Sequence, residues 1–393
     1  RSKMPNEFTA DKDVLGPTTE QNEQHSAFLR KKVQAIRIRK NRKISDLLAA
    51  MRATGFQGRK LGEAFDTLVE MVHDPEVTVL MGYAASLSVA GQWRLIEWLL
   101  QNNFVDILVT TGANISEDIV EAMGHSYFQC SHLADDEKLF QEGINRYYDV
   151  AGNESDYLGM TELLATFIAS LDTSRLYSSR EFLYQCGLWL SANRIRSLVA
   201  IAAEQNIPIF CPAIADSPFG DAALIATSRG VVLGIDAVKD YVEFMSLAKN
   251  VQETGVFYLG GGVPKDFIQL FAVSSDFLYA NRIIPGRQKH RGRATTDETY
   301  YPHKYAIQIT TDAPQWGGLS GCTFDEAVSW GKERRDGQYV QCFCDATVAL
   351  PLLVHALAEV VLKKRKGREL GRYLSGRQAT GGAGPGSAFD IAR

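Results

Sequence analysis

The stretch Gly255-Val256-Phe257-Tyr258-Leu259-Gly260-Gly261-Gly262-Val263-Pro264 decides the fold class. Residues 256–259 are a short apolar run that is typical of a buried strand. Three glycines follow, and Pro264 is favoured in the first turn of a helix. Glycines between a strand and a helix let backbone N–H groups approach a phosphate at the helix N-terminus. The run is not the G-x-G-x-x-G fingerprint, so a tight structural turn explains it as well as a phosphate-binding turn does.

The same alternation of apolar runs and helical stretches extends in both directions from this turn. The expected strands are Val77–Tyr83, Val105–Thr110, Ile207–Pro212, Gly230–Ile235, Gly255–Leu259, Tyr305–Thr310 and Tyr339–Cys344. The expected helices include Gln92–Asn102, Glu117–Met123, Ser191–Gln205, Asp236–Asn250, Asp266–Val273 and Phe324–Arg334. The pattern predicts an α/β protein, in which helices cover both faces of a mostly parallel sheet. Ligands of such sheets bind at the C-terminal ends of the strands.

The composition is that of a globular protein. The chain has 393 residues, of which 45% are hydrophobic and 22% charged, and its net charge is −4. These values exclude a largely disordered chain and argue against a globally basic nucleic-acid binder. Six cysteines in a chain of this length do not make a disulfide scaffold. Because no apolar segment reaches the ~18 residues of a membrane span, and the polar first residues resemble no signal peptide, we expect a cytoplasmic protein without a membrane partner.

Three segments differ in composition from the rest of the chain. Residues 1–40 are predicted to form a polar N-terminal arm that includes a basic, solvated stretch. Residues 281–304 are a polar, basic insertion, which predicts a long surface loop. Residues 363–393 begin with four basic residues and end in a glycine-rich run, so they are predicted to be a disordered tail. The folded domain is therefore expected at residues 41–362.

Polar turns follow three further predicted strands. They are Thr110-Thr111-Gly112-Ala113-Asn114, with Glu117 opening the next helix, then Asp216-Ser217-Pro218-Phe219-Gly220-Asp221, and Asp345-Ala346-Thr347. Helix capping explains carboxylates at such positions, and so does binding of a ribose hydroxyl or an ammonium group. Because all these turns end strands of one predicted sheet, together they favour a ligand site more than any one turn does.

The densest candidate stretch runs from Gly317-Gly318-Leu319-Ser320-Gly321 to Asp325-Glu326-Ala327-Val328-Ser329-Trp330-Gly331-Lys332. A lysine beside a large aromatic side chain in a partly dry pocket can lose its proton and form an imine. From spacing alone, Lys332 is more commonly explained as a surface lysine. The helix predicted at 324–334 can also end at Trp330-Gly331. Cys342 and Cys344 fall on one side of a strand and indicate sheet packing, and no cysteine spacing predicts a metal site.

Residues 325–332 closely resemble the active-site signature of the deoxyhypusine synthase family. Supporting matches occur in the same chain order, and the resemblance covers roughly residues 40–360. They are Val109-Thr110-Thr111 with Glu117-Asp118, Pro212-Ala213 with Asp216 and Gly220-Asp221, Leu259 to Val263, and Asp345-Ala346 with Pro351-Leu352-Leu353.

This resemblance implies a Rossmann-like NAD fold and a homotetramer with active sites at dimer interfaces. It also implies a reaction in which NAD takes a hydride from spermidine and the 4-aminobutyl group passes to a lysine as an imine. An acceptor amine then displaces that lysine. The acceptor is a protein lysine in deoxyhypusine synthases and putrescine in the related homospermidine synthases. A non-catalytic NAD- or polyamine-binding protein is the alternative of another class.

The resemblance assigns roles to individual residues. Lys332 is the expected imine-forming nucleophile, Trp330 the residue that packs on the polyamine, and Glu326 and Asp221 the partners of its ammonium groups. NAD is expected to contact Thr111, Glu117, Asp216, Gly260, Gly261, Gly262, Asp345 and Ala346.

Several positions depart from the family pattern. The family's histidine after the glycines is here Asp266, a stand-in acid or base, and a nearby asparagine is Leu270. Leu319 replaces an acidic residue of the eukaryotic enzymes, and Ala85-Ser86 replaces a serine-asparagine pair. The segment 312–318 resembles a bacterial-type branch of the family. These departures suggest a changed polyamine pocket.

Overall fold

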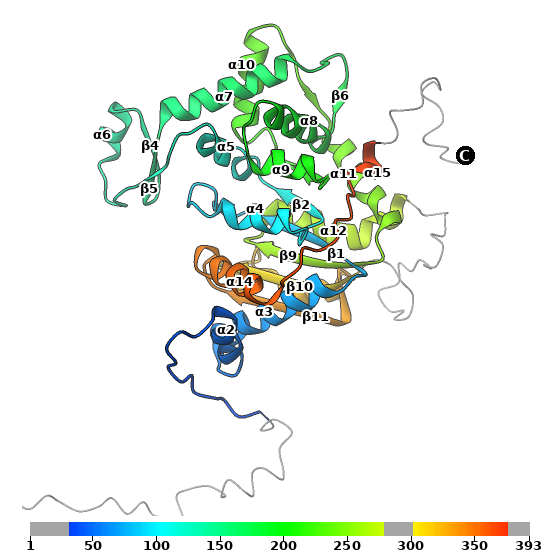
Figure 1. The fold of residues 1–393 in the computed structure, drawn as a ribbon. Helices are drawn as coiled ribbons and strands as arrows, with labels where there is room; N and C mark the ends of the chain where they lie inside the picture. The colour runs from blue at the N-terminus through cyan, green and yellow to red at the C-terminus, as the bar shows by residue number, and fades with distance from the viewer. Residues whose placement is uncertain (1–30, 279–301, 376–393) are drawn as a thin grey trace, which may run out of the picture.

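A six-stranded sheet forms the centre of the fold (Figure 1). The computed structural model describes residues 31–278 and 302–375. All neighbouring strands of the sheet are parallel, so the predicted mostly parallel sheet is confirmed. From one edge to the other the strands are β11 (Glu333–Phe343), β10 (His303–Thr310), β9 (Glu253–Leu259), β1 (Val77–Tyr83), β2 (Ile107–Thr110) and β7 (Ile209–Phe210).

The chain order of these strands creates a switch point in the middle of the sheet. From β1 the chain moves outward through β2 to β7. It then returns to the other side of β1 and moves outward through β9, β10 and β11. This is the strand order of Rossmann folds, in which ligands bind outside the carboxyl ends of the strands where the order reverses. Those two strands are β1 and β9, and the turn 260–262 follows β9 directly.

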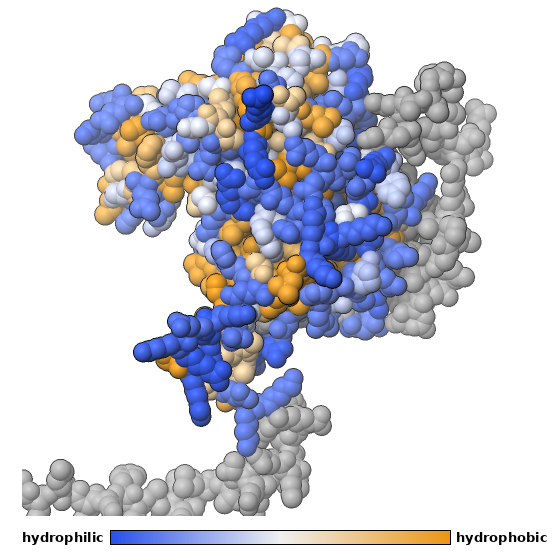
Figure 2. Space-filling model, viewed as in Figure 1, coloured by the Kyte–Doolittle hydropathy of each residue, from blue (hydrophilic) through white to orange (hydrophobic). Residues whose placement is uncertain are grey.

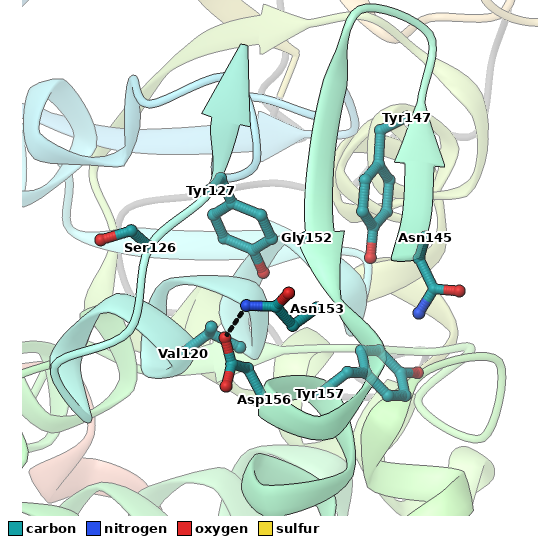
Figure 3. Close-up of a pocket in the computed structure, with 9 residues that line it drawn as sticks. All are labelled: Val120, Ser126, Tyr127, Asn145, Tyr147, Gly152, Asn153, Asp156 and Tyr157. Atoms are coloured by element: carbon teal, nitrogen blue, oxygen red, sulfur yellow. Dashed lines mark hydrogen bonds between the residues drawn. The ribbon is translucent and has the colours of Figure 1, made fainter. Parts of the chain in front are cut away.

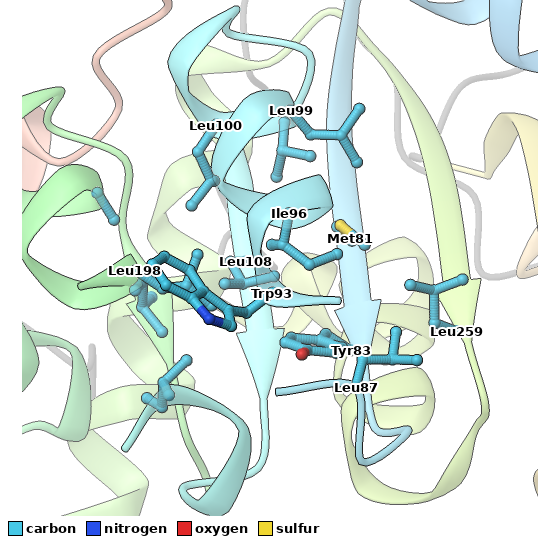
Figure 4. Close-up of a cluster of buried hydrophobic side chains, with 14 of the residues drawn as sticks. Met81, Tyr83, Leu87, Trp93, Ile96, Leu99, Leu100, Leu108, Leu198 and Leu259 are labelled. Atoms are coloured by element: carbon cyan, nitrogen blue, oxygen red, sulfur yellow. The ribbon is translucent and has the colours of Figure 1, made fainter. Parts of the chain in front are cut away.

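Helices cover both faces of the sheet because successive strand residues point to opposite sides. Met81 and Leu259 belong to one apolar layer, part of which is drawn around Tyr83 and Trp93 in Figure 4. Leu80 and Tyr258 belong to the opposite layer. The first layer includes α3 (Phe56–His73), α4 (Trp93–Gln101) and α14 (Ala346–Val360), with α2 (Ile44–Arg52) outside them, and the second includes α11 (Ala237–Ser246), α12 (Gly262–Leu278) and α13 (Phe324–Ser329).

A second group of helices extends the fold beyond β7 and carries a small lobe (Figure 1). The lobe is an antiparallel sheet in the order β3 (Phe128–Gln129), β5 (Val150–Asn153) and β4 (Ile144–Tyr147), together with α6 (Asp136–Gln141). The helices are α5 (Glu117–Ala122), α7 (Glu154–Ala169), α8 (Ser179–Ala192), α9 (Leu198–Glu204) and α10 (Pro218–Ser228).

Three sequence-based element predictions were wrong. Of the strand expected at 230–235, only β8 (Gly234–Ile235) forms, and it pairs with β6 (Leu176–Tyr177) outside the central sheet. The helix expected at 191–205 is interrupted, because Ser197 caps a new helix by accepting from the N–H of Ala200. The helix expected at 324–334 ends at Ser329, since Gly331 adopts a φ of +76° and turns the chain into β11.

The tail expected at 363–393 is partly ordered. Arg365 donates to Asp106 at 2.7 Å, Leu370 is buried, and the N–H of Gly371 donates to the carbonyl of Asn206 at 2.9 Å. These contacts bring α15 (Arg372–Ser375) back against the sheet. Residues 376–393, most of the predicted 281–304 insertion and residues 1–30 of the predicted arm lie outside the described residues. None of the helices described is long and apolar enough to cross a membrane.

Candidate active site

The glycine turn after β9 forms the centre of the C-terminal edge of the sheet. Gly260 and Gly262 have φ values of +76° and +60°, which favour glycine. A Cβ at Gly261 would lie 2.5 Å from Cα of Ser320. The hydroxyl of Ser320 accepts from the N–H of Gly262 at 3.0 Å. The 317–321 loop thus packs on the turn, and only glycine fits between them.

The turns after β2 and β7 pack on each other beside it. A Cβ at Gly112 would lie 2.2 Å from Oγ of Ser217. Asn114 donates to Oγ1 of Thr111 at 3.0 Å. Asp216 is exposed. The turn after β11 completes the edge, where Asp345 accepts from the N–H of Thr347 at 2.8 Å and caps α14, beside Ala346. All four predicted polar turns therefore lie at the same edge.

Glu117 is a buried carboxyl behind this edge. Burial raises its pKa to about 7, and the adjacent charge of Asp118 acts in the same direction. Its Oε2 has no hydrogen-bond partner among the described residues. Burial also raises the pKa of Asp118 to about 7, although Asp118 accepts from the N–H of Leu198 at 2.6 Å. An unpartnered carboxyl oxygen and a glycine-lined switch point fit a ligand that has hydroxyl and phosphate groups.

Lys332 lies directly before β11 and extends toward α12. Its N–H donates to the carbonyl of Ala327 at 3.0 Å, and its own carbonyl accepts from the N–H of His303 at 2.9 Å. Its Nζ lies 3.4 Å from Oδ1 of Asp266 and 5.5 Å from the centroid of the Trp330 ring. The side chain of Lys332 is only 13% exposed. Three predicted site residues therefore meet in one cluster, beside the exposed ring of Trp330.

Glu326 lies on the short helix α13, which ends just before Trp330, and it is exposed to solvent. Its N–H donates to Oγ1 of Thr323, the N-cap of α13, at 3.1 Å. This cap fixes the first turn of the helix. Glu326 is exposed on the surface that also carries Trp330, so an extended ligand can reach both side chains.

Sequence reasoning missed a set of polar side chains buried next to Lys332. Lys265 donates from Nζ to Gln308 at 2.9 Å and to the carbonyls of Cys322 at 2.8 Å and Leu319 at 3.2 Å. Burial lowers the pKa of Lys265 to about 8. Lys265 therefore anchors the loop that packs on the glycine turn. The only sequence signal was its place at the start of a helix, which is also common for surface lysines.

Two further ionisable side chains are buried in this region. Burial raises the pKa of Glu333 well above its ordinary value, although Gln269 donates to its Oε1 at 2.8 Å. Burial lowers the pKa of His303 to about 3, and its Nδ1 lies 2.8 Å from Oγ1 of Thr254. The positive charge of Lys332 acts on both groups. The sequence predicts a helix over 324–334 and gives no signal that Glu333 is buried.

Asp221 lies far from Lys332 within one chain. It is on α10, which follows the edge strand β7, whereas Lys332 precedes the opposite edge strand β11. The six strands span five spacings of about 4.8 Å, or about 24 Å. The structure therefore does not bring Asp221 together with Glu326 and Trp330 in a single copy.

A pocket lined by tyrosines lies beside Asp221 (Figure 3). Tyr157 donates from its hydroxyl to Asp221 at 3.1 Å. In Figure 3 the ring of Tyr127 points toward Asp156, which accepts from Asn153 at 3.0 Å, whereas the ring of Tyr147 points toward Tyr157. Burial raises the pKa values of all three tyrosines, and the charge of Glu117 adds to each shift. Aromatic faces beside the carboxylates of Asp156 and Asp221 suit an organic ammonium group. No group of three metal-ligating residues occurs in residues 31–278 and 302–375.

Comparison with known proteins gives these features a common origin. The model of the family described as "Deoxyhypusine synthase" matches residues 46–357. The chain belongs to the deoxyhypusine synthase family. Members of this family transfer aminobutyl groups, so the chain is a transferase of that type.

Archaeal deoxyhypusine synthases are among its relatives. It is 43% identical over 322 residues to "Probable deoxyhypusine synthase 2" of Methanosarcina mazei, covering 81% of this chain and 88% of the relative. It is 44% identical over 314 residues to the protein of that name in Archaeoglobus fulgidus, covering 80% and 98%. A "Deoxyhypusine synthase-like protein" of the bacterium Chlorobaculum parvum is 34% identical over 340 residues, covering 85% and 91%. Of these three, the archaeal deoxyhypusine synthases are the more similar, which differs from the bacterial-type branch that segment 312–318 suggested.

A solved deoxyhypusine synthase-like structure has the same fold. The crystal structure of a candidate deoxyhypusine synthase from Entamoeba histolytica superimposes with a TM-score of 0.57, at 20% identity, over 86% of this chain and 99% of that chain. At this identity the likeness concerns the fold alone, and it agrees with the Rossmann-like sheet described above.

Proposed function

We propose that this deoxyhypusine synthase family member transfers the 4-aminobutyl group of spermidine to an amine acceptor through an imine on Lys332. The observation that carries the proposal is the placement of Lys332. Its amine is largely buried and faces a carboxylate and an indole ring. A binding protein has no need of a sequestered amine, whereas an imine-forming enzyme does.

The lysine acts as a nucleophile only as the neutral amine. Asp266 lies 3.4 Å from Nζ and is the group placed to take up the proton. Nζ then attacks the C=N carbon of oxidised spermidine, the bond from this carbon to the secondary nitrogen breaks, and 1,3-diaminopropane leaves. The aminobutyl group remains on Lys332 as an imine. The acceptor amine attacks the same carbon, Lys332 leaves as an amine, and reduction of the new imine completes the transfer.

NAD is the group proposed to supply the redox chemistry: when bound, it accepts the hydride from spermidine and returns it to the final imine. The residues placed to hold it are those at the C-terminal edge. We expect the glycine turn 260–262 and Thr111 to contact the phosphates of NAD. The unpartnered Oε2 of Glu117 and the exposed Asp216 would accept from ribose hydroxyls. Asp345 and Ala346 would contact the cofactor from the turn after β11.

The polyamine is proposed to bind between two copies of the chain. Trp330 and Glu326 offer an apolar wall and a carboxylate near Lys332, and Asp221 with the tyrosine pocket beside it offers a second cation site at the other edge of the sheet. About 24 Å separates the two edges, so one spermidine reaches both only if a second copy supplies one of them. Exposed apolar side chains on the small lobe, including Phe128, Leu133 and Phe140, favour such an interface (Figure 2). A homotetramer with interface active sites satisfies this requirement.

Borohydride trapping tests the lysine chemistry. The full chain is incubated with NAD and spermidine, reduced, digested and examined by mass spectrometry. We expect an aminobutyl adduct on Lys332 and none in Lys332→Ala, while the exposed-lysine control Lys60→Ala traps normally. Unchanged trapping in Lys332→Ala would contradict the proposal.

Product analysis separates the acceptors. The proposed acceptor is a protein lysine, as in deoxyhypusine synthases. Putrescine is the second candidate acceptor, because Leu270 and Leu319 replace polar family residues and indicate a changed polyamine pocket. Homospermidine formed only when putrescine is present would identify a homospermidine synthase. Release of diaminopropane without homospermidine would direct the search to a protein lysine. NAD binding without any spermidine consumption would identify the non-catalytic alternative.

Subunit complementation tests the interface site. Asp221→Ala and Lys332→Ala are coexpressed with different tags, and mixed oligomers are isolated. Random mixing of two inactive variants restores about a quarter of wild-type activity when each site draws on two copies. Activity no higher than that of either variant alone would show that each copy is complete.

A further inference from the structure

A second, buried contact joins the same two elements as the Lys332–Asp266 contact. Lys332 and Glu333 are consecutive at the start of β11, and Asp266 and Gln269 are three residues apart on one face of α12. Gln269 donates from Nε2 to Oε1 of Glu333 at 2.8 Å, whereas Nζ of Lys332 lies 3.4 Å from Asp266. The Lys332–Asp266 pair is partly exposed and has the proposed catalytic role, whereas the Glu333–Gln269 pair is fully buried.

The inner pair has two complementary atoms without partners. Glu333 is 3% exposed and Gln269 1%. Oε2 of Glu333 and Oε1 of Gln269 have no hydrogen-bond partner among the described residues. Burial raises the pKa of Glu333 well above its ordinary value, which favours the protonated carboxyl. A protonated carboxyl has one O–H donor, and the free amide oxygen of Gln269 is an acceptor on the group already bonded to it. If the acid O–H of Glu333 donates to the amide oxygen of Gln269, while Gln269 donates from Nε2 to Glu333, neither buried oxygen is left unpaired.

We propose that Glu333 and Gln269 are positioning residues that hold Lys332 at the distance from Asp266 which imine formation needs. The inference rests on the proposed role of Lys332. A lysine side chain has four rotatable bonds, so its amine is placed only as well as its backbone is fixed. Fixing Glu333 to α12 fixes the residue next to it against the helix that carries Asp266.

Three variants test the pair. Glu333→Leu and Gln269→Leu each remove one partner, and the double variant Glu333→Gln with Gln269→Glu exchanges the acid and the amide. Misplacement of a reacting group by about 1 Å costs up to about 100-fold in rate, so we expect each single variant to trap spermidine on Lys332 at least about tenfold more slowly at saturation. The spermidine concentration for half-maximal trapping should change little, and the exchanged pair should recover to within about threefold of wild type. Glu97→Leu, which removes a buried carboxylate on α4 that pairs with Arg196, is the matched control.

A second readout does not depend on catalysis. Competitive acetylation of Lys332, measured by mass spectrometry relative to exposed Lys60, reports how well the amine is held. We expect at least a threefold rise in the single variants and none in the exchanged pair. Thermal unfolding identifies any variant that has not folded, in which case the exchanged pair and the other single variant decide.

Folded single variants with wild-type trapping and acetylation would overturn the inference, and so would an exchanged pair as defective as they are. A wild-type chain that never traps spermidine would defeat the proposed function instead, while acetylation would still test whether Glu333 and Gln269 hold Lys332.

Discussion

Lys265 provides a quantitative test of the buried polar side chains beside Lys332. The side chain is 2% exposed, and three oxygens surround its Nζ, from Gln308, Leu319 and Cys322. Burial is the main cause that lowers its pKa from 10.5 to about 8. The folded chain therefore releases this proton at a lower pH than the unfolded chain does.

The sign of the effect follows from proton linkage. Between pH 8 and 10.5 the unfolded state holds more protons at this site, so the free energy of unfolding rises with pH. Below pH 8 both states are charged, and the folded state carries the full penalty of burying the charge. Lowering the pKa from 10.5 to about 8 corresponds to about 3 kcal/mol in total, of which about 2 kcal/mol is recovered by pH 9.5.

Urea unfolding at several pH values measures this directly. We compare the wild type with Lys265→Met, which replaces the lysine with an unbranched side chain that cannot titrate, and subtract the two free energies so that other titrating groups cancel. From pH 7 to pH 9.5 the wild type should gain about 2 kcal/mol relative to the variant. In the control comparison, the wild type should gain no stability with pH relative to Lys60→Met, which replaces a lysine outside this buried region. Parallel pH profiles of the wild type and Lys265→Met would refute the reasoning.

Three other substitutions have defined outcomes. Asp118→Asn keeps the acceptor for the N–H of Leu198. Because the folded pKa of about 7 lies above the ordinary 3.8, the wild type loses stability between pH 4 and 7 as Asp118 ionises, and the variant does not. In urea unfolding the variant should therefore be more stable than the wild type by up to about 4 kcal/mol at pH 8, and this difference should vanish at pH 4. Arg365→Met leaves the buried Asp106 with the N–H of Val79 at 2.9 Å and the 3.7 Å contact of Arg368, and should lower the free energy of unfolding by about 3 kcal/mol; an unchanged midpoint would mean that the ordered part of the tail contributes nothing. Asp266→Asn should slow borohydride trapping on Lys332 by about 100-fold and steepen its rise with pH, since loss of a general base costs about 100-fold or more, and a full rate at pH 7 would remove Asp266 from the mechanism.

Much of the central fold could be predicted from local patterns. The run 256–259 before the glycine turn is continuously apolar because it is buried on both sides, and this is visible in four residues of sequence. The helix after the turn was predicted over 266–273 with Pro264 in its first turn, and it forms over Gly262–Leu278. Its first turn includes Lys265, whose side chain is buried. Local patterning gives the type of an element, but it does not say which charged residues find buried partners.

The candidate site divides in the same way. Lys332, Trp330 and the glycine turn were found from the sequence because each belongs to one short motif. The partners of Lys265 and Glu333 lie 43 to 64 residues away in the chain, and no periodicity connects residues at that separation. Similarly, Arg365 looked like part of a solvated basic run until the fold placed the buried Asp106 beside it.

The sequence alone determined that this chain has a parallel α/β sheet with a glycine turn after one strand and a lysine signature near another, because hydrophobic period and turn chemistry are local properties. Only the tertiary structure decided that Lys332 faces Asp266, that Glu333 and Gln269 are enclosed beside them, and that Asp221 lies at the opposite edge of the sheet. These outcomes depend on the strand order β11-β10-β9-β1-β2-β7. Strand order is fixed by which apolar faces can be buried together, and this is a property of the whole chain.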